Sequence, residues 1–519
     1  MRIERRKNTI RNMSFGIILR VYELLMPFLM RTVIIYYMGL EYAGLNGLLN
    51  SVLQVLNMAE LGVGSAMVFS MYRPIAENET HKICALMRLY RQYYRLIGIV
   101  VGFLGLLILP WIPDLVKKGV PAGIDITVLY LLHLTATVLS YWLYAYKGAV
   151  LTAHQRNDLI SKVRMGVLSI QYTVQIICVI LWKNYYVFLI TSLVCQVIIN
   201  VTTALMAHKK YPQYTAKGYL EKSDVSKINQ RISDLFVVKL GNVVVSCADT
   251  IVISAFLGLS VLAIYQNYFT ILSAVTGTIS VVYNAILAGV GNSLVVETKE
   301  KNFSDFRKLT FAISWITGFC TCCFLCLYQT FMEIWMGAEH LMEMNAVVCL
   351  CVYFYLYELS RMFDTYKDAA GIWRKDRLRL LVTSFVNLGL NLLVVRTMGI
   401  YGVLLSTIVA FAMVGLPWMI RNLFSEVFGW EHVFVYVKQL INYAVVAILG
   451  CVLTYGICNL LPPFGWASLI IRGIICCIVP NLLFFLVYYR REELDYYKSI
   501  MQQEISRFLK RKCKQEDKS

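Results

Sequence analysis

The sequence has little charge and no long polar segment. Charged residues make up 15% of its 519 residues, well below the roughly 25% of a typical soluble domain. The polar stretches between its apolar runs are too short to fold as a catalytic domain of their own. The composition therefore leaves no room for a soluble catalytic domain.

Sequence motifs for nucleotide-driven chemistry are also missing. The chain contains neither G-x-x-x-x-G-K-[ST] nor G-x-G-x-x-G, two patterns whose glycine-rich loops bind phosphates. No spacing of side chains indicates a nucleophile with its base. We therefore expect a protein that is not an enzyme and has no cofactor. Its energy would come from an H⁺ or Na⁺ gradient, the membrane potential or the gradient of its own substrate.

The chain consists instead of apolar runs that recur from end to end, and 58% of its residues are hydrophobic. Runs of about 18 residues or more span a bilayer as helices, so the sequence predicts an all-α polytopic membrane protein with about 14 transmembrane helices. Lys and Arg gather at the N-terminus, after even-numbered spans and in the C-terminal tail. The opposite loops hold Lys117, Lys118, Lys183 and Arg396. This asymmetry predicts cytoplasmic termini, and it explains the net charge of +18 without a nucleic-acid partner.

Nearly all of the 15 cysteines lie within the apolar runs, so a disulfide framework is not expected. Four of them lie close together in one expected span: Cys320, Cys322, Cys323 and Cys326. A structural zinc site needs a tetrahedral pocket, which one continuous helix cannot supply. We therefore expect no metal site.

An internal repeat divides the chain. Three pairs of similar segments recur at nearly one offset: 38–45 with 257–264, 146–149 with 366–369, and 186–191 with 401–406. Each copy holds six spans, an even number, so the copies form a parallel repeat about an axis along the membrane normal. The expected parts are an N-lobe at 1–208, a cytoplasmic linker at 209–227, a C-lobe at 228–424, an extra helix pair at 433–489 and a cytoplasmic amphipathic tail at 490–519.

The first span, residues 14–38, is unusual because it carries Arg20, Glu23 and Arg31. Each charge at mid-membrane costs about 2.5–3.5 kcal/mol, so this face should meet water, partner charges or a ligand rather than lipid. Adding the repeat offset of 219 to Arg20 gives Lys239, and adding it to Glu23 gives Asn242.

Two cations at corresponding depths of the two lobes suit a phosphate or pyrophosphate, which arginine can bind with two hydrogen bonds. In the alternative interpretation, Arg20 and Lys239 snorkel to the cytoplasmic headgroups. Arg31 could equally snorkel outward, and Thr250 replaces it in the second copy.

The second span carries a polar stripe, because its polar residues follow one another at steps of three and four: Asn46, Asn50, Gln54, Asn57 and Glu60. Residues at these steps share one helix face. The stripe either lines a wet cavity or bonds neighbouring helices. Its length favours a cavity, where Asn and Gln would bind sugar hydroxyls together with Asn242. Glu23, Glu60 and Asp249 are the candidate residues for ion coupling.

Two other sets of polar residues in the spans allow two interpretations each. Glu358, Arg361, Asp364 and Lys367 lie at steps of three, so they either bind a ligand or neutralise one another along the helix. His133 lies deep in the fourth span, either as a hydrogen-bonded core residue or as a proton relay.

Three stretches, MGLEYAGLNGLLNSVLQVLNMAELGVGSA at 38–66, YKGAVLTAHQR at 146–156 and MGIYGVLLST at 398–407, resemble one known family. The same sequence also predicts two six-span lobes, short outer loops and charged first helices, a combination found in that family. The sequence is similar to the polysaccharide flippase branch (O-antigen, capsule and teichoic type) of the multidrug/oligosaccharidyl-lipid/polysaccharide exporter (MOP) superfamily.

The resemblance implies two lobes in a V shape around a central, often cationic, cavity, in the bacterial cytoplasmic membrane. It also implies alternating access that carries an undecaprenyl-pyrophosphate-linked polysaccharide repeat unit from the cytoplasmic to the outer leaflet. The expected partners are this lipid-linked oligosaccharide, the phospholipid bilayer, and glycosyltransferases or the polymerase of the same pathway.

Two alternatives remain. A cation-coupled multidrug exporter of the same superfamily would place acidic residues such as Glu23 and Asp249 in its cavities, but Arg20 and Lys239 would repel a cationic drug. A membrane-embedded sugar polymerase would need a large outer loop, and the outer loops here are short.

Overall fold

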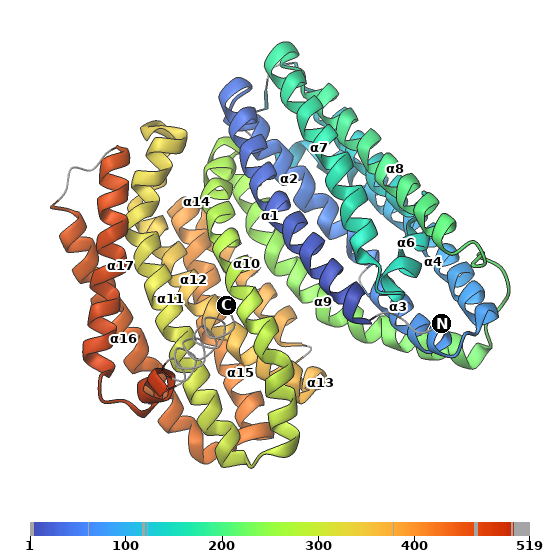
Figure 1. Cartoon of the computed structure of the whole chain (residues 1–519). Helices are drawn as coiled ribbons and strands as arrows, with labels where there is room; N and C mark the ends of the chain where they lie inside the picture. Colours follow the sequence, from blue (N-terminus) through green and yellow to red (C-terminus); the bar gives the residue numbers. More distant parts are fainter. Residues whose placement is uncertain are drawn as a thin grey trace, which may run out of the picture. The chain divides into compact units, whose positions relative to one another are not determined.

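The chain is described by a computed structural model (Figure 1). The description covers residues 5–60, 62–116, 120–121, 123–376, 378–460, 465–499 and 502. Side chains are described in these ranges except at positions 5–14, 17, 59, 234–235, 237–239, 241–242, 244–246, 284–285, 288, 295 and 373–374.

Regular secondary structure in the described ranges is entirely helical. The first helices are α1 (Arg5–Tyr37), α2 (Leu40–Leu56), α3 (Val63–Ala76), α4 (Thr80–Ile108), α5 (Ile126–Trp142), α6 (Ala145–Ala153), α7 (Asn157–Trp182), α8 (Tyr185–Lys210) and α9 (Lys222–Leu257). The others are α10 (Leu259–Val296), α11 (Lys299–Met336), α12 (Met344–Ala370), α13 (Trp373–Asp376), α14 (Arg379–Ala410), α15 (Leu416–Leu423), α16 (Val433–Cys458) and α17 (Trp466–Tyr488). Short 3₁₀ or π turns are η1 (Asn57–Glu60), η2 (Leu109–Trp111), η3 (Pro113–Leu115), η4 (Ala338–His340), η5 (Phe411–Gly415), η6 (Phe424–Phe428) and η7 (Trp430–His432).

The prediction of an all-α polytopic membrane protein is confirmed. Among the described residues, nine helices are long and apolar enough to cross a bilayer, and a tenth span results if α5 and α6 count as one helix bent by 51°. The long helical stretch 379–428 is interrupted at Gly399, whose φ of 58° is in the left-handed region, so it holds two expected spans. The other expected spans lie on α1, on α2 with α3, and on α9.

The described chain forms two compact units. The first unit contains α1 to α9, the part of α10 up to Thr270, and Leu380–Val403 of α14. The second unit contains the remaining parts of α10 and α14 together with α11 to α13 and α15 to α17. The division into lobes at 209–227 stays a prediction from the sequence repeat.

The repeat is visible within the first unit, where α1 turns into α2 and α9 turns into α10. Both turns are made by a glycine with positive φ, Gly39 at 116° and Gly258 at 97°, a conformation that residues with a Cβ rarely adopt. These glycines are 219 positions apart, as are Glu41 and Ser260, whose side chains meet with an Oγ–Oε1 distance of 3.1 Å. In a molecule with twofold symmetry, equivalent residues of the two copies can meet at the twofold axis. The contact between Glu41 and Ser260 therefore agrees with a parallel repeat.

The segment expected as a linker is packed against the first unit. α9 already begins at Lys222, so only residues 211–221 connect it to α8. Arg88 on α4 donates to the Tyr219 hydroxyl at 2.7 Å and lies 3.8 Å from the centre of that ring. The buried ring of His154 lies 4.2 Å from that of Tyr211. The connection is therefore held by contacts at both of its ends.

The second unit is organised around α11, which packs against α12, α16 and α17. Aromatic rings fill much of its core. The ring of Phe306 stacks on those of Phe428 and Tyr436, each with centroids 4.8 Å away, and the Tyr436 hydroxyl lies 3.1 Å from that of Thr310. The burial of these rings fixes α16 against α11 through the hydrophobic effect.

Candidate functional site

A cavity of about 730 Å³ opens in the first unit between α1, α2, α5, α7, α8 and the beginning of α10. Its lining is rich in amide, hydroxyl and other polar groups: Arg31, Asn46, Asn50, Gln54, Asn57, His133, Thr137, Ser140, Gln171, Gln175, Ser192, Gln196 and Thr270. None of the described residues that line it is an Asp or a Glu. The cavity thus offers many neutral hydrogen-bonding groups and one guanidinium.

The polar stripe of the second span supplies one wall. Asn46, Asn50 and Gln54 lie on α2, and Asn57 begins the 3₁₀ turn η1; all four line the cavity. Glu60 ends η1, and its Oε1 atom accepts a hydrogen bond from the Tyr94 hydroxyl at 3.0 Å. The change from α-helix to 3₁₀ helix alters the angular spacing of side chains, so Glu60 no longer follows the stripe into the cavity.

Another wall comes from α7 and α8 and was not predicted from the sequence. Gln175 donates through Nε2 to the Phe188 carbonyl at 2.9 Å and to the Ser192 hydroxyl at 2.6 Å. Gln171 reaches the same hydroxyl at 3.3 Å. The available signal was the four-residue step between Gln171 and Gln175, repeated between Ser192 and Gln196, since such steps place polar groups on one face of a span.

Arg31 lines the cavity but is tied to α10. Its Nε atom donates to the Asn267 side chain, Nη1 lies 3.4 Å from the Gln266 Oε1 atom, and Nη2 donates to the Ala263 carbonyl at 2.9 Å. Asn267 is fully buried. The side chain therefore does not snorkel outward, and several of its donors are already used inside the protein.

The other charges of α1 behave differently. The Arg20 side chain is exposed. Glu23 pairs with Arg164 on α7, with an Oε1–Nη2 distance of 2.8 Å, so its ion-pair partner comes from a neighbouring helix rather than from Arg20. The side chains of Lys239 and Asn242 on α9 lie outside the described residues.

Asp249 is a buried carboxylate in a polar setting. It lies on α9 and is 8% exposed. Its Oδ1 atom accepts hydrogen bonds from the amides of Asn391 at 2.7 Å and Asn387 at 3.1 Å, both on α14. The three side chains thus form one buried polar cluster that joins α9 to α14.

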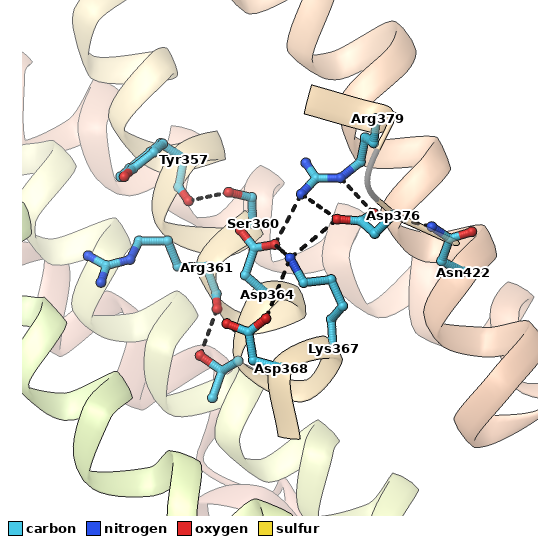
Figure 2. A network of polar contacts seen from close by, with 10 residues as sticks. Tyr357, Ser360, Arg361, Asp364, Lys367, Asp368, Asp376, Arg379 and Asn422 are labelled. Carbon is cyan, nitrogen blue, oxygen red and sulfur yellow. Dashed lines mark hydrogen bonds and ion pairs between the residues drawn. The ribbon is translucent and has the colours of Figure 1, made fainter. Parts of the chain in front are cut away.

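The charge ladder of α12 is extended by partners from the following segment (Figure 2). Lys367 bonds Asp364 at 2.7 Å and Asp376 at 3.2 Å, and Arg379 bonds the same two carboxylates at 3.1 and 2.8 Å. Arg379 is 2% exposed. This geometry agrees with the interpretation in which the ladder neutralises itself, and it joins α12 to α13 and α14.

No protein-family model and no curated protein sequence matches the chain. Among solved structures, the chain is similar to the lipid II flippase MurJ in an inward closed conformation, with a TM-score of 0.68 and 15% identity over 92% of this chain and 99% of that chain. It is also similar to an inward-facing multidrug resistance MATE family transporter of the MOP superfamily, with a TM-score of 0.58 and 12% identity over 78% and 97% of the chains. The Vibrio cholerae MATE transporter VcmN gives a TM-score of 0.54 and 13% identity over 81% and 98%. The chain therefore has the fold that these flippase and exporter structures share.

Proposed function

We propose that the protein is a transporter that flips a lipid-linked oligosaccharide from the cytoplasmic to the outer leaflet by alternating access. The cargo would be a polysaccharide repeat unit attached to undecaprenyl pyrophosphate. The lining of the cavity supports this proposal most, because it combines amides, hydroxyls and one guanidinium without a carboxylate among its described residues. Amide groups both donate and accept hydrogen bonds, as sugar hydroxyls do.

The cations of the two first helices of the repeat would bind the pyrophosphate. Arg20 is exposed on α1, and the repeat pairs it with Lys239 on α9. Arg31 would have a lesser part, because its donors bind α10. Arg20→Ala and Lys239→Ala should each reduce surface polysaccharide while the protein still reaches the membrane.

The fold is equally compatible with a cation-coupled multidrug exporter, since MATE transporters share it. A cavity for cationic drugs needs negative charge to offset the cation's loss of hydration. The carboxylate of Glu23 is engaged by Arg164, and none lines the described cavity wall. We therefore favour a cargo with neutral sugar groups and an anionic linkage.

Deletion of the gene followed by lipid extraction tests the proposal. Lipid-linked oligosaccharide should accumulate on the cytoplasmic leaflet, and mass spectrometry should identify its glycan. An unchanged lipid pool together with new sensitivity to cationic dyes would instead support drug export.

Complementation of the deletion strain connects the phenotype to the cavity. Asn50→Ala and Gln54→Ala remove two cavity amides, each worth about 0.5–1.5 kcal/mol, and the double variant should therefore restore surface polysaccharide only partly. Asn459→Ala removes an exposed amide at the end of α16 and should complement fully. Equal complementation by both would show that the cavity does not bind the cargo.

A further inference from the structure

Three helices of the second unit bring buried thiols to one point. The Sγ atoms of Cys326 on α11, Cys458 on α16 and Cys476 on α17 all lie within 4.8 Å of one another. The three residues are 2%, 0% and 0% exposed. The partly buried side chains packed around them are Cys323, Leu327, Tyr455 and Ile475. The thiols therefore share a small, largely apolar site from which water is excluded.

This arrangement differs from the one that the sequence suggested. The cysteines of α11 follow one another along a single helix, and one helix cannot surround an ion. In the structure, α11 supplies Cys326 to the group and Cys323 to its surroundings, while Cys458 and Cys476 approach from two other helices. Thiols from three helices can therefore surround an ion, which the cysteines of α11 alone cannot do.

A buried cation lies beside the thiols. Arg472 is 7% exposed, one helical turn before Cys476 on α17, and its Nε atom donates to the Ser468 hydroxyl at 3.2 Å. Residues four positions apart share one face of a helix, so Arg472 lies on the same face of α17 as Cys476. A charge buried in a membrane helix is costly unless an opposite charge compensates it, and thiolates at the cluster would supply that opposite charge.

We propose that Cys326, Cys458 and Cys476 form a binding site for one Cu⁺ ion, with Arg472 as the neighbouring charge. Thiolates are the soft ligands that select Cu⁺ and Zn²⁺. Structural Zn²⁺ takes four ligands in a tetrahedron. The group of sulfur atoms that all lie within 4.8 Å of one another here has three members, a set that suits trigonal Cu⁺, and Cys323 packs against this group. Two thiols would lose their protons to the solvent on binding and the third would keep its own, so that Cu⁺, two thiolates and the guanidinium sum to zero charge.

The bound ion would connect the end of α16 and the middle of α17 to α11. These helices already pack against one another, but Cys458 is the last residue of α16, where helix ends fray. A metal bond at this position would hold the hairpin of α16 and α17 against α11 within the second unit. This role is independent of the proposed transport activity.

Anaerobic titration of the purified full-length protein with Cu⁺, in competition with the chelator bicinchoninate, tests the proposal. The wild type should bind one Cu⁺ per chain, and binding should raise the melting temperature. Cys458→Ser and Cys476→Ser should each abolish this binding. Arg472→Gln should weaken it by roughly 10–100-fold, the range seen for residues next to metal ligands. Cys349→Ser changes a buried cysteine of α12 outside the cluster and should bind Cu⁺ like the wild type.

Alkylation of the wild-type protein gives a second measurement that does not depend on the folding of variants. Cu⁺ should protect Cys326, Cys458 and Cys476 from a maleimide during partial denaturation, whereas the half-buried Cys84 near the beginning of α4 should react with or without the ion. Three results would overturn the proposal: equal Cu⁺ binding by the wild type and both serine variants, preference for Zn²⁺ over Cu⁺, or no protection of the three cysteines.

Discussion

At the scale of single residues, the setting of Asp249 bears most directly on energy coupling. Its carboxylate is buried on α9 and held by two amides of α14. Glu23, which is paired with Arg164, and Glu60, which accepts from Tyr94, are only partly buried. An ionisable residue inside a membrane protein commonly belongs to an ion or proton pathway. Of the three candidates for coupling to H⁺ or Na⁺, we therefore favour Asp249.

Replacing Asp249 by Asn tests this role, because the substitution removes the charge and preserves the size. In reconstituted vesicles, transport should fall by roughly 10–100-fold, as expected when a group that holds or orients an ion is lost, and it should no longer respond to an imposed Na⁺ or proton gradient. Asp305→Asn, which removes an ion pair with Lys301 near the beginning of α11, should leave the gradient dependence intact. A gradient response retained by the Asp249 variant would exclude this residue from coupling.

At the scale of helices, the close contact between α2 and the beginning of α10 fixes the centre of the first unit. A Cβ atom on Gly44 would lie 2.2 Å from the Leu259 carbonyl oxygen, a distance that no side chain tolerates. The absence of a side chain at Gly44 thus allows the backbones to touch. The neighbouring Glu41–Ser260 hydrogen bond lies at the same crossing of the two helices.

Gly44→Val should therefore destabilise the protein by about 1–3 kcal/mol, the usual penalty of overpacking. The melting temperature in detergent, followed by circular dichroism, measures this effect. Gly456→Val on α16 is the matched control, because Gly456 is exposed and a Cβ there meets no atom within 4 Å. Equal melting temperatures for the Gly44 variant and the wild type would show that α2 and α10 do not approach this closely.

The connection between α8 and α9 is an element whose docking should depend on pH. Burial of His154 beside Tyr211 and Tyr214 lowers the pKa of the imidazole below its ordinary value, about 6.5. At pH values between the lowered pKa and 6.5, His154 binds a proton only in the undocked state, in which residues 211–221 have left its ring. The docked state is therefore fully stable above pH 6.5 and loses stability as the pH falls below that value.

Limited proteolysis of residues 211–221 at a series of pH values measures this dependence. Cleavage should increase as the pH falls from about 7 to 5.5, the range in which an unperturbed histidine takes up its proton. His154→Phe preserves the ring contacts without a titrating group and should give a flat profile. His432→Gln should retain the slope, because the ring of His432 stacks on Phe303 within the second unit. A flat profile for the wild type would contradict the assignment.

At the scale of the whole molecule, the membrane topology remains a prediction from the distribution of Lys and Arg. Fusions test it, since green fluorescent protein fluoresces only in the cytoplasm and alkaline phosphatase is active only outside. Both terminal fusions should fluoresce, and phosphatase inserted after Lys183, between α7 and α8, should be active. An active phosphatase at either terminus would show that the orientation is the reverse of the predicted one. The proposed direction of flipping would then be reversed as well.

The sequence by itself determined the all-helical membrane class, the repeat and the polar stripe on α2. These features depend on apolar length and on residue spacing along one chain, both of which are local properties. Tertiary structure alone decided that Gln171, Gln175 and Gln196 line the same cavity as the stripe. It also decided that Arg31 binds α10 and that Asn387 and Asn391 reach Asp249. The meeting of three thiols from three helices is likewise a feature of the tertiary structure. The physical reason is that helical periodicity says which residues share a face but not which face of another helix they meet. That pairing is set by side-chain packing between segments far apart in the chain.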